Sequence, residues 1–222
     1  MAVNPIIVLP YQPEWPVQFE IIKADLASDL ADFGCNYITI EHIGSTSVPG
    51  QAAKPVIDIY IIIPAEDFNE RNRLLFCDAM FNGEQRGDYR YMGDGGVGGR
   101  WSFKICLEPR RNISVVAEGS LVSRTSLAVR DTLTSHPELR EKYGNIKMEI
   151  ARETLYHVKG YSQRKNAIIA EILRTAGWSE EEIKVKEDNV TVVLPEIEPG
   201  GKLLSLCLLP CNGFLGAFSR HA

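Results

Sequence analysis

A glycine-serine turn followed at short range by a carboxylate is the pattern in this sequence best suited to chemistry. The stretch IEHIGSTSVPGQAAKPVIDIYIII, residues 40–63, carries the turn Gly44-Ser45-Thr46 between two apolar runs, and one acid, Asp58, interrupts the second run. Hydroxyls and amides at a tight turn or a helix N-terminus suit a phosphate oxygen, and Asp58 could hold Mg²⁺ against the same phosphate. The spacing equally fits a capped short helix beside a carboxylate that satisfies a buried turn.

Tyr60 stands where metal-dependent nucleotidyl transfer would place a second acid. Alternation along a strand puts residues two apart on one face, so that chemistry uses a carboxylate two positions after the first. A phenol, with a pKa of about 10, stays protonated at neutral pH and is a poor Mg²⁺ ligand. We therefore expect weak Mg²⁺ dependence, with Tyr60 contacting an organic ligand. Glu118 is the nearest candidate in sequence for a second acid.

Several basic side chains are candidates for contacts to an anion. Lys54, at the entry to the Asp58 run, either contacts the anion or is a solvated lysine at a strand start. Arg130 and Lys147 either line a basic wall of the cleft or belong to a structural ion pair that includes Asp131. The same alternatives apply to Lys165, which lies four residues after Tyr161. His42, near the turn, is better explained as hydrogen-bonded support than as a base.

Two further patterns have plainer explanations. The segment GDGGVG, residues 93–98, matches a dinucleotide fingerprint, but a strand-like run follows it where a helix is required. We expect a hairpin loop there, which could overhang the cleft as a lid. The five cysteines are scattered and odd in number, which favours reduced packing residues over disulfides, and the close pair Cys207 and Cys211 lacks a second pair for zinc.

The surrounding periodicity predicts the elements that would position these residues. Apolar residues at helical spacing predict an opening helix within residues 12–33. Alternation predicts a strand at 36–43, and a near-continuous apolar run predicts a strand at 54–64 that is buried on both faces. Next come a helix, two strands and a helical region broken at His136-Pro137, in that order at residues 65–81, 99–108, 111–118 and 123–175.

Composition limits the classes of protein and partner. The chain has 222 residues, of which 45% are hydrophobic, and a formal net charge of −5. That length suits one α/β domain with an appendage, and the acidic balance gives no overall reason to expect a nucleic-acid partner. No apolar run reaches the roughly 20 residues that span a bilayer, so we expect a cytoplasmic protein. The turn and the basic candidates above lead us to expect a small anionic substrate.

Four separated blocks resemble the GrpB-like family: YQPEW at 11–15, EHIGSTSVPG with AAKPVIDI at 41–59, VRDTLTSHPELREKY at 129–143 followed by Lys147, and YSQRK at 161–165. The match runs from about residue 6 to residue 178. Domains of that family also occur fused to some bacterial dephospho-coenzyme A kinases, and its fold resembles the nucleotidyltransferase superfamily. The resemblance implies a mixed sheet flanked by helices, with a cleft in which Gly44-Ser45 faces Asp58.

This sequence departs from the family at one strand. Family members typically carry a His-x-His pair where this chain has Asn112 and Ser114, so metal binding or proton transfer that relies on imidazoles is not expected. These two residues can still hydrogen-bond a substrate.

We therefore predict an α/β (α+β) nucleotidyltransferase-like domain at residues 1–178 and a C-terminal extension at 179–222. The extension either covers an exposed edge or is poorly ordered in part. The leading functional hypothesis is group transfer on a nucleotide or another phosphorylated small molecule; the alternatives are a non-catalytic binding module and a metal-independent biosynthetic enzyme. Asp58 is the predicted catalytic and Mg²⁺-binding residue, and the predicted substrate contacts are Gly44, Ser45, Thr46, Lys54, Tyr60, Asn112, Ser114, Arg130, Lys147 and Lys165.

Overall fold

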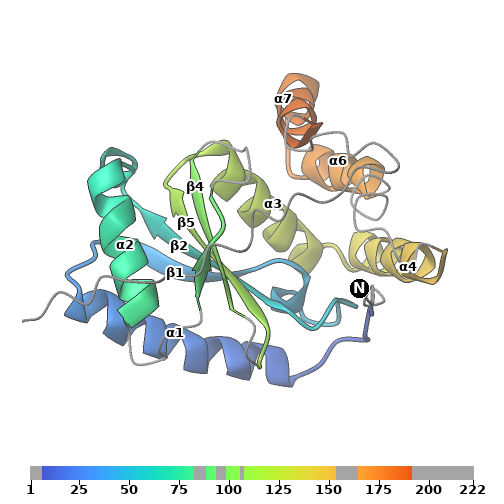
Figure 1. The fold of residues 1–222 in the computed structure, drawn as a ribbon. Helices are drawn as coiled ribbons and strands as arrows, with labels where there is room; N and C mark the ends of the chain where they lie inside the picture. The colour runs from blue at the N-terminus through green and yellow to red at the C-terminus, as the bar shows by residue number, and fades with distance from the viewer. Residues whose placement is uncertain (1–6, 83–88, 94–98, 106–107, 154–164, 192–222) are drawn as a thin grey trace, which may run out of the picture.

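A five-stranded mixed sheet forms the centre of the protein (Figure 1). The computed structural model describes residues 7–82, 89–93, 99–105, 108–153 and 165–191. The strands lie in the order β1-β2-β5-β4-β3, with β2 and β5 parallel and the other neighbours antiparallel. Their bounds are β1 Thr39–Ile43, β2 Ile57–Ile63, β3 Arg90–Tyr91, β4 Arg100–Ile105 and β5 Arg111–Ala117.

Helices cover both faces of this sheet. Helices α1 (Glu14–Asp32) and α2 (Glu70–Asn82) lie along one face, and α3 (Leu121–Ser135) packs on the other (Figure 1). Beyond α3 follow α4 (Pro137–Glu153), α6 (Asn166–Thr175) and α7 (Glu180–Thr191). Two single 3₁₀ turns, η1 (Ser45–Ser47) and η2 (Ala65–Asp67), follow β1 and β2. The result is the mixed α/β domain that the sequence predicts.

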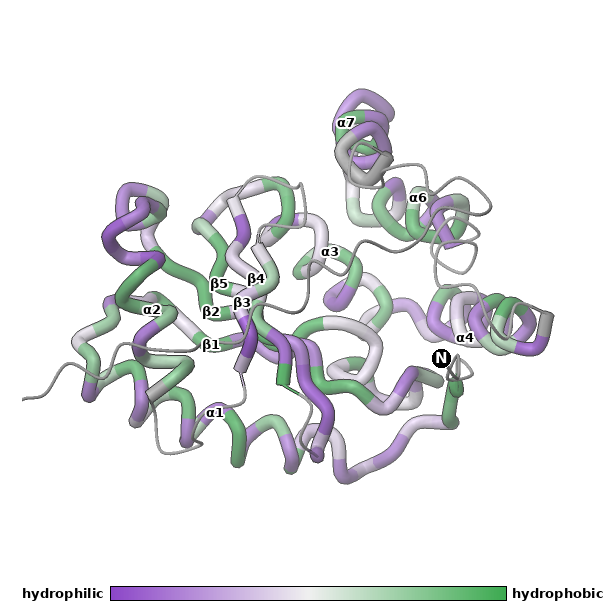
Figure 2. The backbone as a smooth tube through the Cα atoms, in the orientation of Figure 1, coloured by the Kyte–Doolittle hydropathy of each residue, from purple (hydrophilic) through white to green (hydrophobic). Residues whose placement is uncertain are grey.

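Alternation along the strands makes the two faces unlike. The face toward α1 and α2 holds the main apolar core, to which β2 contributes Ile57, Ile59, Ile61 and Ile63. Helix α1 adds its own buried stripe, and Figure 2 shows hydrophobic and hydrophilic stretches alternating along that helix. The opposite face is polar at the end of β2 nearest the η1 turn, because the intervening positions include Asp58 and Tyr60.

Most predicted elements form, and the differences have local causes. The predicted helix at 65–81 begins as the separate turn η2, and α2 starts only after Asn69, whose side-chain oxygen accepts a hydrogen bond from the Asn72 amide at 3.1 Å. The predicted break at His136-Pro137 separates α3 from α4, as expected.

Two described elements were not predicted. Strand β3 has only two residues, which is too short for a periodic pattern, and it pairs with β4 across the segment that carries GDGGVG. Residues 94–98 of that segment lie outside the described residues. Helix α7 falls in the predicted C-terminal extension, for which no helix is predicted from the sequence.

The described helices are either too short or too polar to cross a bilayer.

Candidate functional site

Gly44 and Asp58 are in direct contact at the end of β1. Gly44 has a φ of 72°, and a Cβ atom added there would lie 2.6 Å from Asp58 Oδ2. Any side chain at this position would therefore displace the carboxylate as well as strain the backbone. The glycine of the predicted turn makes room for the acid.

The Asp58 carboxylate is held from the neighbouring strand. Asn112 on β5 is the register partner of Asp58 on β2, and its Nδ2 donates to Asp58 Oδ1 at 2.8 Å. Burial raises the pKa of Asp58, while the Asn112 hydrogen bond and the positive charges of Lys165 and Lys54 oppose that rise. Asn112, for which the resemblance leads us to expect an imidazole, here orients the acid.

A cavity of about 180 Å³ opens beside this carboxylate, and three lysines line it. Lys54 comes from the segment before β2, Lys147 from α4, and Lys165 from the turn that precedes α6. Ser45 and Asp58 line the same cavity, so the structure brings together the turn, the acid and three of the four basic residues that the sequence nominates.

Lys147 is the most unusual of these cations, because its side chain is only 2% exposed. Its Nζ donates to Ser45 Oγ at 2.8 Å and to the Ala52 carbonyl oxygen, and it lies 4.3 Å from the centre of the Tyr143 ring. Burial lowers the pKa of Lys147 to about 6, with a further contribution from the charge of Lys165. Burial also lowers the pKa of Lys54, again with repulsion from Lys165. Both ammonium groups would gain from a bound anion.

Thr46 supports this turn. Its hydroxyl donates to the Val56 carbonyl oxygen at 3.2 Å and lies 3.0 Å from His42 Nε2. Since the threonine proton goes to Val56, His42 Nε2 is the donor in the second bond, and burial together with Arg130 lowers the pKa of His42 to about 4. His42 is thus neutral support, as expected. The predicted helix N-terminus is a single 3₁₀ turn, Ser45–Ser47, and not the start of a longer helix.

A second cavity, of about 450 Å³, continues along the polar face and shares Asp58 and Asn112 with the first. Tyr60 and Ser114, partners in the β2–β5 register, both line it. Tyr60 Oη lies 2.9 Å from Ser126 Oγ on α3, and burial raises the pKa of the phenol. Tyr60 therefore stands at the position where a second carboxylate was considered, and its hydroxyl forms a hydrogen bond with Ser126 of α3.

Arg130 lies away from both cavities. Its guanidinium donates to Glu41 at 2.7 Å, to Asp131 at 2.8 Å and to the His42 carbonyl oxygen at 3.1 Å, which makes it a structural link between α3 and β1. Of the two residues predicted for the cleft wall, Lys147 lines the cavity and Arg130 does not. Glu118 follows the far end of β5, six residues beyond Asn112 and about 20 Å away along an extended chain. Tyr161 lies outside the described residues.

Sequence reasoning missed the cavity-lining cations on β4 and α7. Arg100, Ser102 and Lys104 line the second cavity from β4, and Lys186 lines it from α7. The signal on β4 was present, because its polar residues alternate with buried Trp101, Phe103 and Ile105. No pattern in the sequence brings α7 to the sheet.

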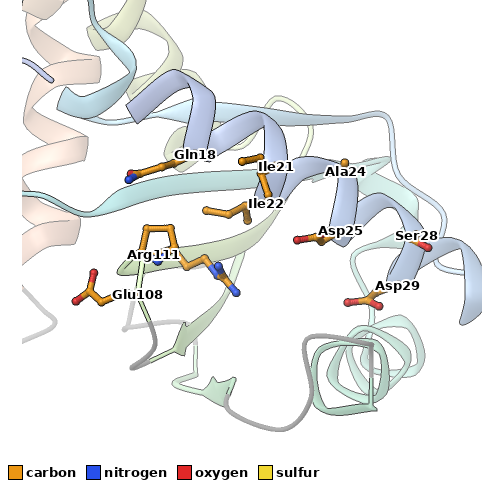
Figure 3. Close-up of a pocket in the computed structure, with 10 residues that line it drawn as sticks. Gln18, Ile21, Ile22, Ala24, Asp25, Ser28, Asp29, Glu108 and Arg111 are labelled. Carbon is orange, nitrogen blue, oxygen red and sulfur yellow. The ribbon is translucent and has the colours of Figure 1, made fainter. Parts of the chain in front are cut away.

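A third cavity, of about 590 Å³, lies on the opposite face between α1 and β5. Figure 3 shows Arg111 extending from β5 toward Asp25 and Asp29 of α1. Arg111 Nε also donates to Tyr89 Oη at 2.7 Å. These residues were not nominated from the sequence, where Arg111 is noticeable only as a charged residue that opens an apolar strand.

The surroundings of Asp58 are a poor fit for Mg²⁺. One of its oxygens accepts from Asn112, the other lies against Gly44, and the positive charges of Lys54 and Lys165 already act on the carboxylate. Asp58 is the one carboxylate lining either polar-face cavity within the described ranges. The same part of the chain holds no group of three His, Cys, Asp or Glu side chains that could coordinate a metal ion.

Fold and site together define a mixed α/β domain with a lysine-lined cavity against a single carboxylate. The family model described as GrpB protein matches residues 5–175. The chain belongs to the GrpB family.

A solved GrpB structure supports the same assignment. GrpB from Enterococcus faecalis, described as a conserved protein, superposes with a TM-score of 0.64 at 30% identity, covering 82% of this chain and 99% of that one. A chain of the GLD-2/RNP-8 complex gives a TM-score of 0.51 at 13% identity, over 72% of this chain and 60% of that chain. At that identity the second likeness is one of fold alone.

Curated relatives carry names without a stated activity. UPF0157 protein PA4798 of Pseudomonas aeruginosa is 30% identical over 77% of this chain and 67% of its own length. UPF0157 protein YqkA of Bacillus subtilis is 28% identical over 72% of this chain, but the match spans only 43% of that protein.

Proposed function

We propose that this protein binds a phosphorylated or otherwise anionic small molecule in the lysine-lined cavity and acts on it by metal-independent group transfer. The observation that carries the proposal is that Asp58 and Lys147 line the same cavity. The pKa of the carboxyl group is raised and that of the amine is lowered. Perturbed titratable groups that share one cavity are typical of sites that carry out acid–base chemistry.

The anion would be held by charge and by hydroxyl donors. Three lysines face one carboxylate, in a protein whose formal net charge is −5, so the cavity concentrates positive charge locally. A neutral Lys147 uses its two N–H groups on Ser45 and Ala52, and on protonation it gains a third for the ligand. The lysines would then neutralise the ligand in the way that Mg²⁺ does in conventional nucleotidyl transfer.

A non-catalytic binding module is the second candidate, and Tyr60 is the observation that favours it. The fold keeps the first acid of the nucleotidyltransferase-like pattern, but the phenol at the second position bonds Ser126. A chain that had lost transfer chemistry could keep an anion-binding cavity with one acid and a phenol in place of the second.

Calorimetry with inorganic phosphate tests the anion site. We expect Lys147→Met to weaken phosphate binding at least tenfold, because it removes a cation that can donate to the ligand. Lys142→Met is the matched control on the same helix: Lys142 is exposed and pairs with Glu171 at 2.7 Å. Lys54→Gln, at a less buried position, checks the result if Lys147→Met unfolds. Equal binding by all these variants and the unmodified protein would refute the anion site.

A further inference from the structure

Helix α7 lies beyond the region matched by the family model and still contributes to the polar face. The match ends at residue 175, whereas α7 runs from Glu180 to Thr191. Lys186 on α7 lines the 450 Å³ cavity, the larger of the two on the polar face, together with Tyr60 and Ser114 of the sheet. This chain therefore adds a wall and a cation to a cavity whose floor lies within the matched region.

The position of α7 is fixed by several contacts. Ile183 is 3% exposed and packs with Leu173 of α6. Arg124 of α3 pairs with Glu182 at 2.6 Å, and Ser179 and Glu182 bond each other's backbone amides at the start of the helix. Lys186 is therefore held toward the cavity by a docked helix.

Positive charge is gathered at this cavity as it is at the first. Arg100 and Lys104 line it from β4, and Lys104 is the register partner of Asn112. Burial lowers the pKa of Lys186, Glu187 opposes this effect, and the charge of Lys165 adds to it. Lys165 also lowers the pKa values of Lys54 and Lys147, so its charge acts on the lysines of both cavities.

We propose that the two cavities form one bipartite site for a small molecule with two anionic groups, and that Lys186 recognises the second group. The inference rests on the proposed function, since the first group occupies the 180 Å³ cavity. The cavities meet at Asp58 and Asn112, which line both. The larger one has room for a polar organic body, and Ser102 and Thr125 offer it hydroxyl groups.

Two pairs of probes isolate the second anionic group. Glycerol 3-phosphate and 3-phosphoglycerate differ by a carboxylate, whereas fructose 6-phosphate and fructose 1,6-bisphosphate differ by a phosphate. Calorimetry on the full chain would measure all four with the unmodified protein, Lys186→Gln and the control Lys184→Gln. Lys184 is exposed on the same helix and does not line the cavity. A thermal melt of each variant would confirm that α7 stays folded.

We expect the two-anion member of at least one pair to bind at least tenfold more tightly than its partner. Lys186→Gln should reduce that advantage about tenfold and leave the single-anion member unchanged, while Lys184→Gln changes neither. The pair that responds identifies the second group as carboxylate or phosphate.

The inference is overturned if the second anion adds no affinity in either pair, or if Lys186→Gln affects both members equally or neither. If the single-anion probes still bind in those cases, the proposed function stands. If none of the four probes and no inorganic phosphate binds, the proposed function fails as well.

Discussion

The two faces of the sheet are built from the same strands and serve different ends. On the face toward α1 and α2, β2 presents four isoleucines to an apolar core, in which Ile113 of the adjacent β5 and Phe103 of β4 are also fully buried. On the face toward α3, the same strand presents Asp58 and Tyr60 to cavities lined by cations. The comparison shows how alternation lets one strand supply both the stability and the site.

Each face should therefore respond to a different kind of perturbation. Changes on the apolar face should reduce the free energy of unfolding and leave anion binding intact in the folded fraction. Changes on the polar face should alter binding at a smaller cost in stability, except where a residue holds the backbone of the turn.

The largest expected effect is on the apolar face. Ile61 is fully buried in the main core, and Ile61→Ala should lower the free energy of unfolding by about 4 kcal/mol, through lost burial and a residual cavity. Ser114→Ala on the other face should cost about 1 kcal/mol or less, because the nearest hydroxyl partner, Ser102, is 3.5 Å away. Urea denaturation measures both. Similar losses in the two variants would remove the distinction between the faces.

Gly44→Ala is the exception on the polar face. The backbone there has a φ of 72° and the new methyl group would meet Asp58 Oδ2, so we expect a loss of about 3 kcal/mol together with weaker anion binding. Gly34→Ala is the matched control, since Gly34 has a φ of 65° with nothing near its would-be Cβ, and it should cost only about 1 kcal/mol. If the two alanine variants lose the same free energy of unfolding, the contact with Asp58 does not constrain this turn.

Anion binding should depend on pH through Lys147. In the free protein its pKa is about 6, set by burial and by Lys165, and a bound anion favours the charged form and raises that pKa. Affinity should therefore increase as pH falls toward 6, by at most about tenfold per unit, and level off below. Asp58, Lys54 and Lys165 line the same cavity and share its field. Titrations with sulfate, which keeps its charge over this range, measure the slope.

Lys147→Met should flatten that pH profile. A profile that is steep in both proteins would assign the proton to another group, and a flat profile in the unmodified protein would show that protonation of Lys147 is not linked to anion binding.

A small effect on stability and none on phosphate binding are expected at Tyr60. Tyr60→Phe removes the hydroxyl that lies 2.9 Å from Ser126 and should cost about 1 kcal/mol of stability. Inorganic phosphate should bind as before, since Tyr60 lines only the larger cavity. Chemical denaturation and phosphate titration give the two values. Lost phosphate binding in this variant would place Tyr60 in the anion site itself.

Local patterns predict the elements of this fold well, and they predict the site only in part. Helix α1 and strands β2, β4 and β5 follow from periodicity, and the Gly44 turn with Asp58 follows from residue type and spacing. Lys147 was nominated, but the sequence left open whether it faced the cleft.

The remainder depends on tertiary contacts that no window of sequence contains. Arg130 could pair with a neighbour or line the cleft, and the choice is made by Glu41, 89 residues away in sequence. Lys186 reaches the cavity because α7 docks on α3 and α6. The roles of Gly44 and Asn112 toward Asp58 emerge from packing between strands.

The most direct test of the central claim is the effect of Asp58→Asn on binding, measured by calorimetry with inorganic phosphate and with a nucleoside triphosphate, each with Mg²⁺ and with EDTA. Asparagine keeps the shape of the side chain and removes the only carboxylate among the described residues of the lysine-lined cavity. The account predicts that Asp58→Asn binds both anions at least as tightly as the unmodified protein, because a negative charge has left the site, and that Mg²⁺ makes little difference. Tight binding that requires Mg²⁺ and is lost in Asp58→Asn would contradict it and make Asp58 a metal ligand.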